Sequence, residues 1–174
     1  MIKEIFSQKN INNVFNERIS KSSGSGIDGI SLSNFNLTNE VEIIYRKVLN
    51  NTYKFTKFKL KLINKGKGKP PREISIPTIR DRIVLRIMSE YLTSKFKKFV
   101  SLETPQNIIK NVKVQINCNQ YNHFIKIDIK NFFPSINHEQ LMKRIKRFIR
   151  NDQILKLIKA SVTTQSIFSS HDES

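Results

Sequence analysis

The stretch KFKLKLINKGKGKPPREISI, residues 57–76, is the part of the sequence most informative about the fold. In its first six residues lysine alternates with an apolar side chain, which predicts a half-buried strand with one apolar and one basic face. The glycines and prolines of residues 66–71 predict a long turn, and REISI (72–76) returns as a second strand that ends at Pro77. The sequence therefore predicts a two-stranded basic hairpin that projects from the fold. Its apolar face is expected to comprise Phe58, Leu60 and Leu62.

Helices are expected upstream and downstream of this hairpin. A helix predicted over 78–97 begins at Thr78, a residue type suited to the N-cap. Upstream, apolar residues at helical spacing predict a helix over 39–50 and a short amphipathic helix over 1–19. Between these two helices lies a Gly/Ser-rich loop with a predicted turn at Asp28-Gly29.

The second half of the chain is expected to contain a strand between helices. Residues 108–116 are predicted to be helical, and FIKIDI (124–129) predicts a buried central strand because apolar and β-branched residues dominate it. Asn137 and Gln140 form a capping-box pair at the start of the next helix. A last helix is predicted over 152–160, followed by a polar Ser/Thr tail. The apolar face of the helix after Asn137 is expected to comprise Leu141, Ile145, Phe148 and Ile149.

Composition limits the class of protein. The chain has 174 residues and a formal net charge of +17, from 31 Lys and Arg against 14 Asp and Glu. No apolar run approaches the ~20 residues of a transmembrane helix, and the N-terminus lacks the pattern of a secretory signal. The single cysteine, Cys118, excludes an internal disulfide framework and a multi-cysteine zinc site. These features predict a soluble cytoplasmic protein whose partner is a polyanion, either nucleic acid or an acidic membrane surface.

Two basic clusters indicate where a polyanion would bind. Residues 54–72 carry eight basic residues and no acidic one, and MKRIKRFIR (142–150) carries five basic residues. Two patches on one binding surface are one interpretation, and ordinary solvated faces are the other. For Arg80 and Arg82 the alternative is a structural ion pair with Asp81 in the first turn of a helix. The residues predicted to contact nucleic acid are Lys57, Lys59, Lys61, Lys67, Lys69, Arg80, Arg82, Lys143, Arg144 and Arg147.

Asp128 is the residue most informative about chemistry. It lies in the apolar FIKIDI run, and a buried carboxylate is costly unless it is paired or binds a metal. An acid at the end of a strand that faces a basic cleft is the arrangement of a Mg²⁺-dependent phosphoryl-transfer site, where the metal bridges carboxylate and phosphate oxygens. The alternative is that Asp128 caps the following turn or pairs with Lys126.

Four segments, in order along the chain, resemble motifs of bacterial reverse transcriptases. IKIDIKNFFPSINHEQL (125–141) is similar to the first metal-binding motif of their palm, and REISIPTIRDRIVLRIM (72–88) to a segment of their fingers. GSGIDGISLSNF (24–35) resembles the element that precedes the fingers in group II intron-type enzymes, and the basic hairpin follows TYKF (52–55) as in that group. The resemblance covers residues 24–150 and suggests the group II intron, abortive-infection or antiviral-defence kind.

This resemblance implies a role for each matching residue. Asp128 would be the first metal-binding carboxylate, and the backbone carbonyl of Ile129 would contact the same Mg²⁺. Phe133 would stack under the sugar and leave no room for a 2′-hydroxyl. Lys65 and Arg72 would hold the incoming triphosphate and neutralise charge in the transition state.

The chain also departs from the family pattern. It contains no aromatic-X-Asp-Asp motif and no Gly-Gln-Gly segment, and two-metal chemistry cannot be assembled from Asp128 alone. We therefore expect an α/β fragment with an N-terminal helix (1–20), fingers (21–100) and a partial palm (101–174), truncated before the rest of the palm and the thumb. The function implied is RNA-directed DNA synthesis from dNTPs with Mg²⁺ on an RNA template and a DNA primer. Three explanations of the missing parts are open: the chain is one half of a split enzyme that a second polypeptide completes, it is a truncated or frame-shifted product, or it kept the nucleic-acid binding of the fold and lost catalysis.

A non-catalytic RNA-binding module is the rival prediction. The aromatic residues interleaved with the lysines of the hairpin suit this role, since rings stack on bases while lysines contact phosphates. Asp128 followed by Phe133 favours the polymerase, because a simple binder gains nothing from an acid in its cleft. A basic membrane-surface protein is a weaker third prediction, because the chain lacks a long amphipathic helix with large aromatics on its apolar face.

Overall fold

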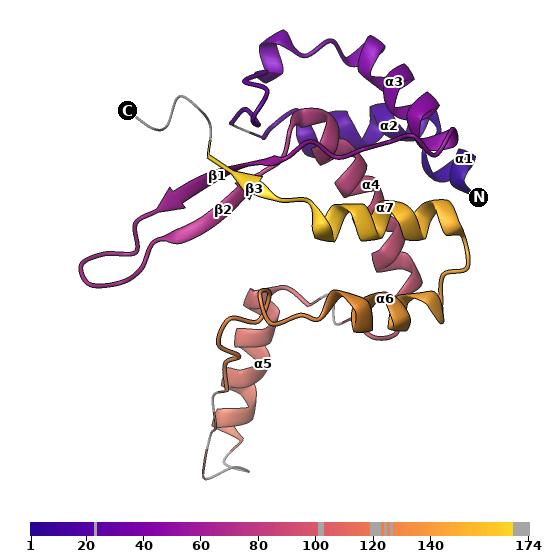
Figure 1. Cartoon of the computed structure of the whole chain (residues 1–174). Coiled ribbons are helices and arrows are strands. Elements are labelled where there is room, and N and C mark those ends of the chain that lie inside the picture. The colour runs from indigo at the N-terminus through magenta and orange to yellow at the C-terminus, as the bar shows by residue number, and fades with distance from the viewer. Residues whose placement is uncertain (23, 101–102, 119–122, 124, 126, 169–174) are drawn as a thin grey trace.

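A computed structural model describes residues 1–22, 24–100, 103–118, 123, 125 and 127–168 of the chain. Figure 1 shows a helical body from which a hairpin and a helical arm extend in different directions. The body contains α1 (Ile2–Ile5), α2 (Gln8–Val14), a π-helical turn η1 (Phe15–Ile19), a 3₁₀ turn η2 (Leu32–Asn34), α3 (Leu37–Leu49), α4 (Ile79–Lys95), α6 (His138–Lys146) and α7 (Asp152–Thr163). The arm contains α5 (Pro105–Asn117), and the sheet contains β1 (Phe58–Ile63), β2 (Arg72–Ile76) and β3 (Ser166–Ile167). The fold is mixed α/β, as the sequence predicts.

The N-terminal segment, predicted as one helix over 1–19, is broken at Ser7. The Ser7 hydroxyl accepts a hydrogen bond from the backbone N–H of Asn10 at 3.3 Å and so starts α2 after the single turn of α1. The break places Phe6 and Ile11 together in the core, where both are buried.

Helix α4 is the centre of the core. Its N-cap is Thr78, as predicted, since the Thr78 hydroxyl accepts a hydrogen bond from the backbone N–H of Asp81 at 3.2 Å. The first half of α4 packs against α2, η1 and α3. The largest fully buried side chains include residues from all of these helices except η1: Ile11, Ile44, Val48, Ile79, Ile83, Val84 and Ile87.

The predicted hairpin is confirmed. β1 and β2 pair antiparallel from Lys59 opposite Ile76 to Ile63 opposite Arg72, and the turn contains two glycines, at positions 66 and 68, with positive φ. The outer half of β1 is not half-buried as expected: Leu62 is 45% exposed, because the hairpin extends beyond the helices (Figure 1).

A third strand forms where a polar tail was expected. β3 pairs parallel with β1, with Phe58 opposite Ser166, so that the strand order is β2-β1-β3. The backbone N–H of Phe58 donates to the carbonyl of Gln165 at 2.9 Å. The end of the described chain therefore lies against the base of the hairpin.

The predicted buried strand at 124–129 is wrong for the residues described there. Residues 125 and 127–129 have no regular secondary structure, and Ile125 and Ile127 are 87% and 84% exposed. A strand needs neighbours to bond with, and the three strands of the described chain all lie at the hairpin. Phe124 and Lys126 of the predicted strand lie outside the described residues, so the alternative pair of Asp128 with Lys126 does too.

Helix α6 begins as predicted, and its apolar face differs at one residue. The Asn137 side chain accepts a hydrogen bond from the backbone N–H of Gln140 at 3.0 Å. Ile145 and Ile149 are buried, but Phe148, which lies in the turn after α6 ends at Lys146, is 51% exposed. No helix in the described part of the chain combines the length and the apolar character of a membrane span.

Candidate functional site

The hairpin carries seven of the twelve basic residues that the sequence assigns to nucleic acid or to the incoming nucleotide. Lys65 lies in the turn and Arg72 opens β2, so both lie at the outer end of the hairpin, and both are exposed. Lys59 is half-buried on β1. The remaining predicted contacts on the hairpin are also exposed: Lys57, Lys61, Lys67 and Lys69. A projecting strand pair with this charge can follow a phosphate backbone.

A groove of about 490 Å³ lies at the base of the hairpin. The Gly/Ser-rich loop forms one wall, and β1, Ile76 of β2 and Phe168 form the rest. Lys59 and Lys61 line it, so two of the predicted contacts border a hollow and not a flat face.

The Gly/Ser-rich loop is held firmly against the start of α4. The predicted turn is confirmed: the backbone N–H of Gly29 donates to the carbonyl of Gly26, and Asp28 accepts from the backbone N–H of Ile30 at 3.2 Å. A Cβ on Gly26 would lie 2.7 Å from the backbone of Thr78, so only glycine allows this approach.

Arg82 anchors the same loop from α4. Its guanidinium donates to the carbonyls of Pro77 at 3.0 Å and Gly24 at 2.6 Å, and to the Ser22 hydroxyl at 3.2 Å. Burial lowers the pKa of Arg82, partly offset by the charge of Asp28. The geometry therefore gives Arg82 a structural task, and contact with nucleic acid remains a prediction for it.

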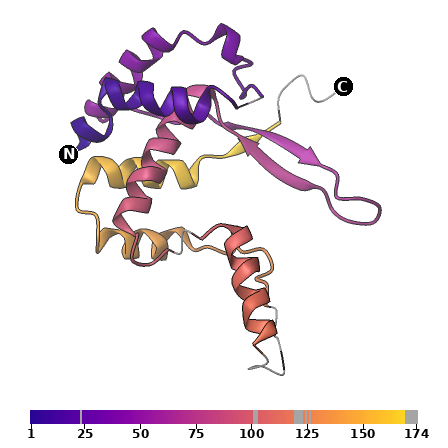
Figure 2. The ribbon, with the colours of Figure 1, turned by 180° about the vertical axis from the view of Figure 1, so that it is seen from behind.

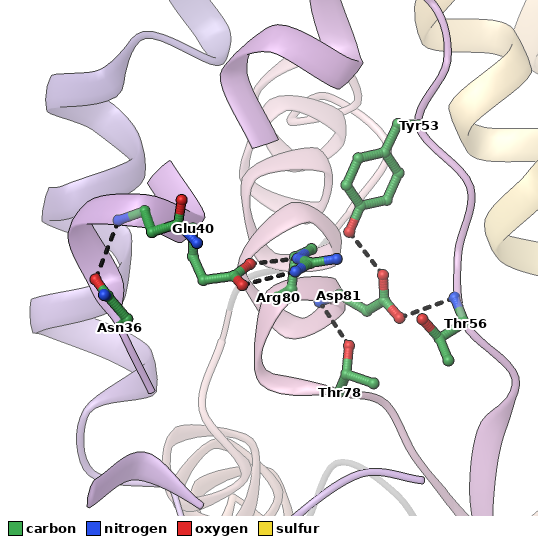
Figure 3. Close-up of polar contacts among 8 residues, drawn as sticks. Asn36, Glu40, Tyr53, Thr56, Thr78, Arg80 and Asp81 are labelled. Atoms are coloured by element: carbon green, nitrogen blue, oxygen red, sulfur yellow. Dashed lines mark hydrogen bonds and ion pairs between the residues drawn. The ribbon is translucent and has the colours of Figure 1, made fainter. Parts of the chain in front are cut away.

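Arg80 and Asp81 belong to a buried polar network, shown in Figure 3. Arg80 pairs with Glu40 of α3 through two hydrogen bonds, one from Nη2 to Oε1 at 2.6 Å and one from Nε to Oε2. Asp81, which is 1% exposed, accepts from the Tyr53 hydroxyl at 2.6 Å and from the backbone N–H of Thr56 at 3.0 Å. The expected local Asp–Arg pair is wrong, because each residue binds a partner far away in sequence.

Two buried groups of this network, the Asp81 carboxyl and the Tyr53 phenol, have a raised pKa. Burial raises the pKa of Asp81, although its hydrogen bonds from Tyr53, Thr78 and Thr56 act in the opposite direction. Burial and then the charge of Asp81 raise the pKa of Tyr53 well above its ordinary value. Sequence reasoning missed the role of Tyr53, since no local pattern joins residues 28 positions apart.

The Asp128 segment lies apart from the hairpin. Asp128 and Ile129 are exposed, and Phe133 is 80% exposed with its ring against Phe132 at a centroid distance of 5.2 Å. In Figures 1 and 2 the segment that leads into α6, residues 127–137, runs along the arm, while the hairpin points in another direction. The structure therefore does not bring Asp128 and Phe133 to Lys65 and Arg72.

The residues present do not by themselves fit a Mg²⁺ site. Within the described ranges no group of three or more His, Cys, Asp or Glu side chains could hold a metal ion. The predicted donors are the Asp128 carboxylate and the Ile129 carbonyl, whereas catalytic Mg²⁺ demands near-octahedral oxygen coordination that includes carboxylates and substrate phosphates. Further carboxylates are required before metal chemistry can be assigned to this segment.

The second basic cluster lies on the exposed side of α6 and the turn after it. Lys143, Arg144 and Arg147 are exposed, whereas Met142 and Ile145 face the core. This separation of charge from apolar contact is the one that the sequence predicts.

Comparison with known proteins gives the family. Residues 63–172, more than half of the chain, match the family model of reverse transcriptase (RNA-dependent DNA polymerase). The chain belongs to the reverse transcriptase family, which confirms the resemblance of its motifs and agrees with partial fingers and palm.

Two curated relatives are longer proteins. The putative COX1/OXI3 intron 1 protein of Saccharomyces cerevisiae is 30% identical over 158 residues, which cover 82% of this chain and 18% of the relative. Protein YkfC of Escherichia coli K12 is 27% identical over 147 residues, which cover 76% of this chain and 38% of the relative. The chain spans less than two-fifths of the length of either protein.

Proposed function

We propose that this chain supplies the fingers and the first part of the palm of an RNA-directed DNA polymerase, and that a second polypeptide supplies the remaining carboxylates. The observation that carries the proposal is the order of parts along the chain: a projecting basic hairpin, a capped helix and then the Asp128 motif, of which the helix and the motif lie wholly within the family match. The proposed divisions are residues 1–20, 21–100 and 101–174. The name of the yeast relative supports an intron-type ancestry, and a role in antiviral defence stays a prediction.

The hairpin would bind template, primer and incoming nucleotide. Lys65 and Arg72 lie together at its outer end, where two cations can hold a triphosphate. The lysines of β1 and the turn would contact phosphates of the template strand. Because Arg72 is assigned to the triphosphate and the other lysines to the template, Arg72→Gln is expected to raise the KM for dNTP more than it weakens the binding of primer–template.

The Asp128 segment would become a palm strand on assembly. Ile125, Ile127 and Ile129 are each more than 60% exposed, although isoleucine favours burial in a sheet. Strands from a second polypeptide would cover these side chains and bring further carboxylates beside Asp128. Mg²⁺ would then have the ligands that the described part of the chain lacks.

Primer extension tests the proposal. The tagged chain is purified from its native host with whatever remains bound, and incorporation of dNTPs is measured on an RNA template with a DNA primer. Incorporation by the wild type that is lost in Asp128→Asn, with binding of primer–template retained, is the expected result. Lys9→Gln, an exposed charge change on α2, is the matched control.

Absence of incorporation by the wild-type assembly would contradict the polymerase. Salt-sensitive binding of RNA without any polymerase activity would then favour the RNA-binding module, for which the net charge of +17 is the supporting observation.

A further inference from the structure

Three phenylalanines cluster where the end of α4 meets the turn after α6. The ring of Phe148 lies 5.2 Å from that of Phe96 and 5.4 Å from that of Phe99, both edge to face. Phe96 is partly buried against the core, whereas Phe99 and Phe148 are 69% and 51% exposed. Both Figure 1 and Figure 2 show the ends of these two helices side by side, away from the hairpin.

The cluster exposes two aromatic side chains, Phe99 and Phe148, to solvent. Scattered exposed apolar residues are common on soluble proteins, but rings that gather on one face are typical of an interaction site. Because Phe99 and Phe148 pack on each other and on Phe96, little conformational freedom remains to be lost when a flat ligand stacks on them.

Charge around the cluster selects the kind of partner. The two segments that carry the rings, 91–102 and 140–151, contain no acidic residue. Their basic side chains are all exposed, and Lys98 and Arg147 each directly precede an exposed phenylalanine. Rings bordered by cations are complementary to bases bordered by phosphates. The basic side chains are Lys95, Lys97, Lys98, Lys143, Arg144, Lys146, Arg147 and Arg150.

We propose that this surface, the α4–α6 patch (residues 95–99 and 143–150), binds single-stranded nucleic acid by stacking bases on Phe99 and Phe148. The inference rests on the proposed function in one respect, namely that the chain binds nucleic acid. It adds a second contact, separate from the hairpin, and names stacking as its mode. Lys143, Arg144 and Arg147 then act beside the rings and not as an isolated basic face.

Tryptophan fluorescence tests the stacking directly. The chain contains no tryptophan, so Phe99→Trp introduces a single reporter at an exposed position. Titration with a single-stranded oligoadenylate is expected to quench this fluorescence saturably. Gln8→Trp, at an exposed uncharged position on α2, is the control reporter and is expected to keep its emission.

Affinity measurements separate stacking from charge. Phe99→Ala and Phe148→Ala are each expected to weaken binding of the oligoadenylate by about fivefold or more. Lys97→Gln/Lys98→Gln is expected to lower the slope of log affinity against log salt by about 1.4, the value for two phosphate contacts on a single strand. The fluorescence anisotropy of a labelled oligoadenylate gives both quantities.

The outcomes distinguish this inference from the proposed function. If the oligoadenylate binds but does not quench the fluorescence of Phe99→Trp, and if Phe99→Ala and Phe148→Ala bind it as tightly as the wild type, the inference that the α4–α6 patch binds nucleic acid is overturned. The hairpin then remains the proposed binding site. A Phe99→Trp emission that is already shifted to the blue and insensitive to RNA would show a ring covered by protein, which also overturns the inference. If the wild type binds neither RNA nor primer–template, the proposed function fails as well.

Discussion

Tyr53 and Asp81 show how a buried pair connects the hairpin to the body. Asp81 lies in the first turn of α4, and its carboxylate accepts hydrogen bonds from Tyr53 and Thr56, which precede β1. A buried carboxylate without donors is costly, so these bonds hold the base of the hairpin in one position. The residue pair therefore links the stability of the core to the placement of the basic strands.

Removing the Tyr53 hydroxyl should destabilise the fold. Tyr53→Phe leaves Asp81 buried with one donor fewer, and we expect a loss of about 1–3 kcal/mol in the free energy of unfolding. Urea unfolding followed by circular dichroism measures it. Tyr45→Phe is the control, since the Tyr45 hydroxyl makes no hydrogen bond to another described residue. A decrease of the same size in the unfolding free energy of Tyr45→Phe would show that the hydrogen bond from Tyr53 to Asp81 is not what stabilises the fold.

The same pair predicts the behaviour of the fold at high pH. The raised pKa of Tyr53 means that the folded chain keeps the phenol proton at pH values where the unfolded chain has lost it. This contribution to stability is complete below the ordinary value of 10.0 and is lost as pH rises from there toward the folded pKa. The unfolding free energy of the wild type should therefore fall more steeply above about pH 10 than that of Tyr53→Phe. Equal slopes would show that Tyr53 ionises equally easily in both states.

Among the elements, those with local signals were predictable. The hairpin follows from alternation and from turn glycines, and α4 and α6 follow from their N-caps, Thr78 and Asn137. The strand expected at 124–129 has the right residue types, but the described strands all lie at the hairpin and none of them pairs with the described residues of this segment, since pairing is not a local property. β3 was missed for the opposite reason: Ser166 and Ile167 carry almost no strand signal, and β1 supplies their partner.

The same distinction holds for the candidate site. The basic residues of the hairpin and of α6 could be identified from the sequence because charge and periodicity place them on the surface. The partners of Arg80 and Asp81 could not be identified, since Glu40 and Tyr53 lie 40 and 28 residues away. Only the packing of α3 and of the segment before β1 against α4 brings these side chains together.

Arg82 should control the order of the Gly/Ser-rich loop. Arg82→Ala removes the hydrogen bonds to the carbonyls of Pro77 and Gly24 and to the Ser22 hydroxyl, so we expect faster amide exchange in residues 24–30 while α4 stays protected. Hydrogen–deuterium exchange with mass spectrometry measures both. Arg86→Ala, which removes an exposed pair with Glu90, is the control and should leave the loop unchanged. Unchanged exchange in Arg82→Ala would show that Gly26 packing alone holds the loop.

The molecule as a whole consists of a small helical core from which a basic hairpin projects. The core supports a charged hairpin and leaves the segment around Asp128 exposed on a separate arm. The net charge of +17 gives long-range attraction to any polyanion, so affinity for primer–template should fall steeply with salt. A flat dependence on salt would contradict an interface built on phosphate contacts.

We propose that the hairpin binds nucleic acid and that Asp128 serves the chemical step and not binding, and one experiment tests this difference. The affinity for an RNA–DNA primer–template is measured for Asp128→Ala and for Lys61→Gln/Lys67→Gln, with Lys3→Gln/Lys9→Gln as a charge-matched control. Asp128→Ala is expected to bind within about twofold of the wild type, whereas the hairpin variant is expected to lower the slope of log affinity against log salt by about 1.4–1.8. A several-fold loss in Asp128→Ala, or a hairpin variant that binds like the control, would contradict this proposal.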